Sequence, residues 1–206
     1  MLVLTLLNPK GGSGKTTLAA AIAVHATKAG RRVTLIDTDP QASLYQWSQR
    51  RSSEIAISAQ AVPVTGLARQ IGALKRGREF DLIVIDTHGS LTGIEPAVGH
   101  GDRVLIPIQP SGADLLELNK ALVYCQRQSA IVAIVANRVK TQAERIEIAQ
   151  SLTALAAGRA SVCSVQIGDR VAYRSHFLSG MTAEEVGDRK AQQEIAQLCA
   201  ELEIIT

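Results

Sequence analysis

A glycine-rich loop near the N-terminus constrains the fold of this chain more than any other feature. Residues 10–16 read Lys-Gly-Gly-Ser-Gly-Lys-Thr, between an apolar run and a helix-forming stretch. Glycines let the backbone turn tightly, so that several N–H groups and the N-terminus of the following helix point at one anion. In such a loop the second lysine contacts the β- and γ-phosphates of a nucleotide, and the threonine hydroxyl binds Mg²⁺. The loop therefore predicts a strand before it, a helix after it, and a site for Mg²⁺ and ATP.

The remaining sequence alternates short β-branched runs with longer helical patterns, which predicts a doubly wound α/β fold. The apolar runs are continuous, as in Leu82-Ile83-Val84-Ile85, which is typical of strands buried on both faces. We expect a mostly parallel sheet flanked by helices, of the P-loop NTPase type, in a single domain over residues 1–206. The expected strands are 2–7, 32–37, 80–86, 103–107, 131–136 and 161–166, with a further short strand around 59–62. The expected helices are 15–29, 41–50, 64–74, 113–128, 143–157 and 183–202.

Composition agrees with one domain and excludes several other classes of protein. The 206 residues suffice for one ordinary core, and aromatic residues make up only 3%, so Val, Ile, Leu and Ala must fill it. The net charge of +3 permits a nucleic-acid partner but does not demonstrate one. Cys125, Cys163 and Cys199 are widely spaced and form no CxxC motif, so we expect reduced thiols in a cytoplasmic protein and no metal site.

The apolar N-terminal run is expected to be a buried strand. It has no basic segment before it, has no small-residue cleavage site, and leads directly into the glycine loop, so it does not read as a signal peptide. No apolar run approaches the roughly 20 residues that a membrane span needs. We therefore expect no membrane association.

Carboxylates stand at the ends of two predicted strands. Asp37 and Asp39 follow the second strand, and Asp86 ends the strand 80–86. Open α/β sheets bind ligands at this edge, where a carboxylate can orient an attacking water or hold Mg²⁺ through water. Asp39 has an alternative role as a cap of the helix that starts near Gln41, and that role is compatible with catalysis.

These motifs together resemble the ParA/MinD family, which includes nitrogenase iron proteins and arsenite-pump ATPases. The spacing Lys-Gly-Gly-x-Gly-Lys-Thr-Thr resembles the family's deviant Walker A motif, in which the first lysine reaches the ATP of a partner subunit. The resemblance implies this role for Lys10, and an exposed loop lysine is the alternative. The string Asp-x-Asp-Pro-Gln at 37–41 resembles the family's switch I segment, which implies that Asp39 positions or activates the hydrolytic water while Asp37 supports the metal shell. Residues 80–87 have the Walker B layout.

The predicted site combines these residues. The candidate catalytic residues are Lys10, Lys15 and Asp39. The candidate nucleotide ligands are Lys10, Gly11, Gly12, Ser13, Gly14, Lys15, Thr16, Thr17 and Asn137, and the candidate metal residues are Thr16, Asp37 and Asp86. Asn137 is included because an asparagine at this strand end in relatives hydrogen-bonds the adenine; a turn asparagine is the alternative.

Three other side chains near these motifs have less defined roles. His88 stands in the switch II position, where relatives usually have proline or an alanine-glycine pair; it senses the γ-phosphate, faces a partner, or is a tolerated loop residue. We expect Tyr45 and Trp47 to serve packing or dimer contact rather than nucleotide stacking.

The resemblance extends over essentially the whole chain and implies a small ParA-type ATPase that positions a cargo. Such proteins form an ATP-bound homodimer that binds double-stranded DNA without sequence preference, and a ParB-like or other cargo-bound activator stimulates hydrolysis and releases the dimer. The implied location is the cytoplasm, on the nucleoid. The chain starts at its first strand, so we expect no N-terminal helix-turn-helix. Candidate phosphate contacts are Arg138, Lys140, Arg145, Arg170, Arg174, Arg189 and Lys190.

Three alternatives from other classes remain open. A MinD-like membrane regulator needs a basic amphipathic C-terminal helix, whereas residues 201–206 are acidic and apolar. An iron–sulfur reductase needs cysteines near the switch loops, where this chain has none. A biosynthetic P-loop enzyme needs a pocket for a small-molecule acceptor, and no motif indicates one.

Overall fold

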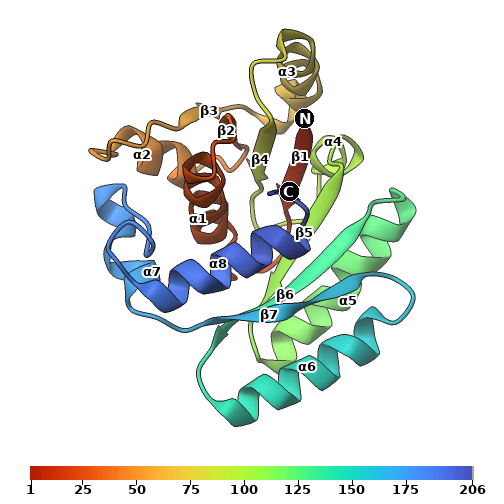
Figure 1. Cartoon of the computed structure of the whole chain (residues 1–206). Coiled ribbons are helices and arrows are strands. Elements are labelled where there is room, and N and C mark those ends of the chain that lie inside the picture. The colour runs from red at the N-terminus through yellow and green to blue at the C-terminus, as the bar shows by residue number, and fades with distance from the viewer. Residues whose placement is uncertain (206) are drawn as a thin grey trace.

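The computed structural model describes residues 1–205 and contains one seven-stranded sheet in the order β3-β2-β4-β1-β5-β6-β7 (Figure 1). Every neighbouring pair of strands is parallel, because each connection crosses back through a helix. The strands are β1 (Leu2–Leu6), β2 (Val33–Asp37), β3 (Ser58–Ala61), β4 (Leu82–Asp86), β5 (Arg103–Ile108), β6 (Val132–Val139) and β7 (Ser161–Gly168). The predicted fold class is confirmed.

Helices cover both faces of the sheet. They are α1 (Lys15–Lys28), α2 (Ser43–Gln49), α3 (Val64–Gly77), α4 (Glu95–Gly99), α5 (Gly112–Arg127), α6 (Gln142–Ala156), α7 (Ala172–Ser175) and α8 (Arg189–Glu201), with a 3₁₀ turn η1 (Phe177–Ser179). One core cluster joins α1, α2 and α8 to one face, and two clusters join α3 with α4 and α5 with α6 to the other. The chain therefore folds into three layers.

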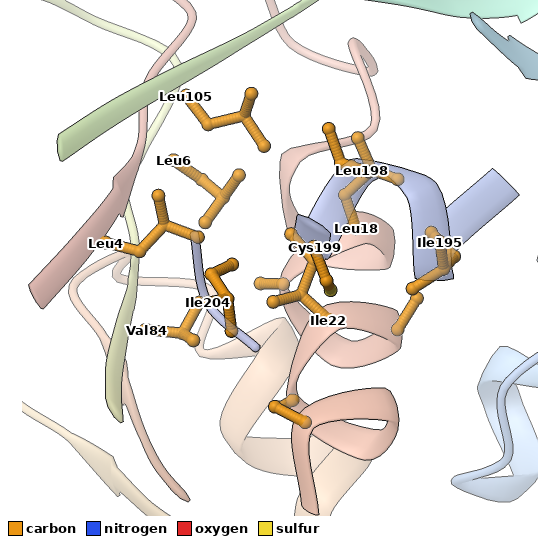
Figure 2. Packing of buried hydrophobic residues seen from close by; sticks show 14 of the residues in the cluster. Leu4, Leu6, Leu18, Ile22, Val84, Leu105, Ile195, Leu198, Cys199 and Ile204 are labelled. Atoms are coloured by element: carbon orange, nitrogen blue, oxygen red, sulfur yellow. The ribbon is translucent and has the colours of Figure 1, made fainter. Parts of the chain in front are cut away.

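The core beneath α1 and α8 is aliphatic, as the low aromatic content requires. Leu18 and Ile22 of α1 and Leu198 of α8 face Leu4 of β1 and Leu105 of β5, and all five side chains are at most 1% exposed (Figure 2). This packing fixes α1 over the strand that precedes the glycine loop. The loop is thus held at both ends.

The predicted helix 183–202 is wrong in its first turn and a half, because α8 begins at Arg189. Gly187 adopts φ +82°, which interrupts a helix, and the Asp188 carboxylate accepts hydrogen bonds from the N–H groups of Lys190 and Ala191 at 3.1 and 3.0 Å. Asp188 is therefore the N-cap of α8. Residues 183–187 form turns, from which Glu184 bonds to α1 and Glu185 bonds to Arg51.

Strand register places two of the predicted metal residues side by side. In the β2–β4 pairing Asp37 lies opposite Asp86, and in the β1–β4 pairing Leu6 lies opposite Asp86. The glycine loop follows β1, so loop and carboxylates meet at one edge of the sheet. Among residues 1–205, no helix combines the length and apolarity that crossing a bilayer requires.

Candidate nucleotide site

The loop between β1 and α1 has the backbone shape that its glycines predict. Gly14 adopts φ +98°, and a Cβ there would lie 2.2 Å from Nδ2 of Asn137. A larger residue would therefore be strained in its backbone and would collide with β6. The main chain at this position turns into α1, whose first N–H groups face the space beyond the loop.

Lys15 is held in the site with its ammonium group inside the protein. The residue is 7% exposed, and Nζ donates a hydrogen bond of 3.1 Å to the carbonyl oxygen of Asn8. Burial lowers the pKa of Lys15, while the carboxylates of Asp86 and Asp39 oppose that shift. A phosphate group would supply the negative charge that this buried cation lacks.

Thr16 and Asp86, two of the predicted metal residues, are hydrogen-bonded to each other. The Thr16 hydroxyl donates to Oδ2 of Asp86 at 2.7 Å, although 70 residues separate them. The other carboxylate oxygen, Oδ1, is buried and has no hydrogen-bond partner among residues 1–205, and the same holds for Oγ of Ser13. Oxygens are the ligands that Mg²⁺ prefers, directly or through its water, so this donor set fits that ion.

The carboxylate of Asp37 accepts hydrogen bonds from three backbone N–H groups. Oδ2 accepts the N–H groups of Leu44 and Tyr45 at 2.8 and 3.0 Å, and Oδ1 accepts the N–H of Asp39 at 3.0 Å. Burial raises the pKa of Asp37, and these hydrogen bonds counteract the rise. Asp37 therefore holds the first turn of α2, and its predicted support of the metal shell stays a prediction.

Asp39 is half-buried beside this cap. Its Oδ1 accepts the N–H of Gln41 at 2.9 Å, a local turn that ends before α2, and the N-cap position of α2 is Ala42. The alternative role of Asp39 as a helix cap is therefore wrong, because Asp37 takes the N–H groups of the first turn of α2. Because its own N–H is bonded to Asp37, the position of Asp39 depends on how α2 is seated. The water-activating role of Asp39 stays a prediction.

Lys10 forms an ion pair within its own chain. Its Nζ lies 2.5 Å from Oδ2 of Asp114, a residue of α5 whose side chain is fully buried, while the Lys10 side chain remains 40% exposed. The predicted reach of Lys10 into a partner subunit is untested. Our sequence reasoning missed Asp114, although Ser111 and Asp114 form the Ser-x-x-Asp pattern that starts a helix, and the Ser111 hydroxyl accepts the N–H of Asp114 at 3.2 Å.

Asn8 is a second residue that the sequence did not single out. Its Nδ2 donates to the carbonyl oxygen of Pro107 at 2.7 Å, and its Oδ1 accepts the N–H of Lys10 at 2.8 Å. Together with the contact to Lys15, these bonds fasten the start of the loop to β5. A lone asparagine before a proline carries no pattern that would have revealed this.

Asn137, the predicted base-recognition residue, lies against the phosphate loop. Its Nδ2 donates to the carbonyl oxygen of Ser13 at 2.7 Å, and the residue is 5% exposed. It borders a pocket beside the loop whose further lining residues include Gly14, Thr17, Ile167, Gly168, Tyr173 and Arg174. The adenine contact of Asn137 stays a prediction.

The segment after β4 lies against the loop. A Cβ at Gly89 would come within 3.3 Å of the N atom of Gly11 and 3.4 Å of the carbonyl oxygen of Pro9, so the two backbones are in close contact. His88 is half-buried next to this contact. The structure thus brings the predicted switch II position to the phosphate loop without defining a role for His88.

Asp86→Asn is expected to stabilise the protein without nucleotide or metal at neutral pH. Burial raises the pKa of Asp86 from 3.8 to about 7, with Asp37 and Asp39 adding to the rise while Thr16 and Lys15 oppose it. Because the folded pKa exceeds the unfolded one, ionisation of Asp86 costs stability between about pH 4 and pH 7. The variant should gain about 1–3 kcal/mol at pH 7.5 and little at pH 4.5, measured by urea unfolding.

The matched measurement is the same pair of unfolding curves for Glu203→Gln, a surface carboxyl that is 69% exposed. Its stability should depend on pH as that of the native chain does. Equal losses of stability between pH 4.5 and 7.5 in Asp86→Asn and the native chain would show that Asp86 is not the titrating group.

Comparisons with known proteins agree with this geometry. Residues 4–183 match the family described as the CobQ/CobB/MinD/ParA nucleotide binding domain. The Maintenance of carboxysome distribution protein A of Halothiobacillus neapolitanus is 27% identical over 212 residues, covering 97% of this chain and 95% of that protein. The protein of the same name from Gloeobacter kilaueensis is 32% identical over 120 residues, covering 56% of this chain and 53% of that protein.

A solved structure shows the same fold. The ATP complex of a variant of Cyanothece McdA superimposes with a TM-score of 0.79 at 19% identity and covers all of this chain and 98% of that one. At this identity the likeness demonstrates the fold alone. The match over residues 4–183 includes the phosphate loop and all three carboxylates, and this chain therefore belongs to the CobQ/CobB/MinD/ParA family of nucleotide-binding domains.

Proposed function

We propose that this protein is an ATP-hydrolysing positioning protein of the ParA type. It binds Mg²⁺ and ATP at the loop, dimerises with ATP, binds nucleoid DNA without sequence preference, and is released when a cargo-bound activator stimulates hydrolysis. The observation that carries the proposal is the meeting of Lys15, Thr16 and Asp86 at one sheet edge, with a buried cation and with buried oxygens that have no partner in the described part of the chain, residues 1–205.

Phosphoryl transfer depends mainly on positioning and charge stabilisation, so the residues of this edge suffice for hydrolysis. When bound, Mg²⁺ would supply positive charge that stabilises the phosphate oxygens. Lys15 would bind the phosphates, Thr16 and Asp86 would hold the metal with its water, and Asp39 would orient the attacking water. Lys10 leaves Asp114 to reach the partner's nucleotide, a change that its 40% exposure permits.

The basic residues proposed for DNA differ in their present contacts. Arg170 pairs with Glu194 at 2.5 Å, and Arg174 pairs with Asp169. Lys140, Arg189 and Lys190 are exposed, and none of these three forms an ion pair within residues 1–205. They are the first candidates for phosphate contacts in the ATP-bound dimer.

The cargo follows only from the relatives. Two of them are named for the distribution of carboxysomes, so a protein compartment is the first cargo to test, ahead of a plasmid or a chromosome origin. The gene for the activator protein would be expected beside the genes for that cargo.

Binding to random-sequence duplex DNA is expected with ATP and Mg²⁺ and to be absent with ADP or without nucleotide. The reason is that two subunits must present their basic residues together before enough phosphate contacts form. Fluorescence anisotropy at several salt concentrations measures both the affinity and its salt dependence. Lys140→Glu, Arg189→Glu and Lys190→Glu should each flatten the salt slope by about one counterion per subunit.

Lys75→Glu is the matched control, because Lys75 is an exposed lysine in the last turn of α3. It should leave the DNA affinity and its salt slope unchanged. ATP hydrolysis without DNA binding in any nucleotide state would refute the nucleoid mechanism. Sedimentation with anionic liposomes and a screen of small-molecule acceptors would then test a membrane regulator and a biosynthetic enzyme.

A further inference from the structure

Two consecutive glutamates in the turn before α8 reach two different helices. The carboxylate of Glu184 lies 2.9 Å from Nδ1 of His25 and 3.2 Å from Nζ of Lys28, both on α1. The carboxylate of Glu185 lies 2.7 Å and 3.2 Å from the two terminal nitrogens of Arg51, just after α2. Both glutamate side chains are 4% exposed.

Arg51 is the centre of a buried cluster. Its side chain is 5% exposed, and its guanidinium lies 4.7 Å from the centre of the Trp47 ring. Trp47 stacks on Phe177 with ring centres 6.1 Å apart, so α2 is tied to η1 as well. Arg51 also donates to the carbonyl oxygens of Ile55 and Gly180 at 2.9 Å each.

The two segments touch at the level of the main chain. Gly180 adopts φ +75°, and a Cβ there would lie 2.7 Å from the backbone of Arg50 and Arg51. Only glycine permits this approach. The segment around Gly180 therefore packs against the end of α2 in one defined position.

Both helices that the glutamates hold carry parts of the nucleotide site. Helix α1 begins at Lys15, directly after the phosphate loop. The first turn of α2 is bonded to Asp37, which in turn holds the N–H of Asp39. The spacing of α1 and α2 therefore sets where Asp39 stands relative to the bound phosphates.

The chemistry of the pairs favours a role in positioning. Burial would raise the pKa of Glu185, but hydrogen bonds from Arg51 and the Thr182 N–H lower it below its ordinary value. Burial would also raise the pKa of Glu184, but the contacts with His25 and Lys28 lower that pKa below its ordinary value. Apolar residues of similar volume often stabilise a fold as well as a buried ion pair does, whereas ion pairs with fixed donors specify geometry.

We propose that Glu184 and Glu185 form a two-glutamate staple that fixes the spacing of α1 and α2 and thereby positions Asp39 for hydrolysis. The members of the staple are positioning residues, and they lie outside the set of residues assigned above to the nucleotide and the metal. This inference rests on the ATP hydrolysis proposed above, and it needs neither DNA binding nor any cargo.

The test compares Glu185→Gln and Arg51→Lys with the native chain. Glutamine keeps the size of the side chain and removes its charge, and lysine keeps the charge and loses the planar fork of donors. We expect the single-turnover rate of ATP hydrolysis to fall about 10-fold in Glu185→Gln and less in Arg51→Lys, since small displacements of a catalytic group cost rate steeply. The dissociation constant for ATP should change less than about threefold, because Lys15 and the loop are untouched.

Trp47 provides a second readout, since it is the only tryptophan in the sequence. The fluorescence emission of Trp47 should change when ATP is added to the native chain. In both variants the emission maximum should differ from that of the native chain, because the cluster around Arg51 is packed differently. Glu203→Gln is the matched control, a surface Glu→Gln change in an ion pair with Arg103 at the start of β5. It should match the native chain in rate, affinity and emission.

Two results would overturn the staple. One is a native hydrolysis rate in both variants; the other is a fall of rate, ATP affinity and melting temperature in common proportion, which marks a merely structural role. If Glu185→Gln does not fold, Arg51→Lys decides alone by the same criteria. A native chain that hydrolyses no ATP refutes the proposed function and this inference with it, whereas hydrolysis without DNA binding refutes only the nucleoid mechanism.

Discussion

Lys15→Ala is expected to abolish ATP hydrolysis and, with it, every ATP-dependent step. Lys15 is 7% exposed, its ammonium group is bonded to the carbonyl oxygen of Asn8, and the charges of Asp86 and Asp39 act on it. Without it these carboxylates would face the phosphates with no compensating charge from the protein. Removing one such donor costs about 10²–10³ in rate, and here ATP affinity should fall as well, as isothermal titration calorimetry would measure.

Lys75→Ala is the control for this loss. Lys75 is exposed in the last turn of α3, where the helix returns to the opposite edge of the sheet. Its affinity for ATP should equal that of the native chain. Retention of native ATP affinity in Lys15→Ala would contradict the placement of the phosphates at this loop.

Asp39→Ala is expected to separate binding from hydrolysis. Asp39 is half-buried, its Oδ1 accepts the N–H of Gln41, and its Oδ2 has no hydrogen bond within residues 1–205, so this oxygen could orient water. A general base or water-positioning group contributes about 10²–10⁴ in rate, so turnover should fall by at least about 10² while ATP affinity stays within about threefold. Analytical ultracentrifugation with ATP should then show a dimer that persists long after the native dimer has dissociated.

Glu79→Ala is the control for this second prediction, because Glu79 is an exposed carboxylate before β4, at the opposite edge. It should hydrolyse ATP at the native rate. If Asp39→Ala also turns over ATP at the native rate, the water must be positioned by another group. Asp37 would be the first residue to examine, although its carboxylate is already bonded to three N–H groups.

Features that depend on local rules could be read from the sequence. A glycine loop between a strand and a helix has one useful geometry, because φ values such as +98° at Gly14 are open to glycine at low cost. Continuous apolar runs predict strands buried on both faces, and a carboxylate after such a run lies at the ligand-binding edge. The loop, Lys15, Thr16 and Asp86 were therefore predictable.

Local rules failed where long-range contacts compete with propensity. Residues 183–188 contain helix-forming side chains, yet Gly187 breaks the helix, Glu184 bonds to α1, and Glu185 bonds to Arg51 just after α2. The sequence around these residues does not indicate that their partners lie more than 130 positions away. The segment therefore forms turns that bond to other parts of the chain, and α8 starts only at Arg189.

The sequence by itself determined the fold class and the phosphate-binding loop, because both follow from backbone sterics and from the periodicity of apolar residues. Only the tertiary structure decided that Asp37 lies beside Asp86, that Asp114 holds Lys10, and that the staple joins α1 to α2. Strand order and helix spacing result from how the layers bury their apolar faces together. The same local pattern is compatible with several such arrangements, and packing of the whole chain selects one.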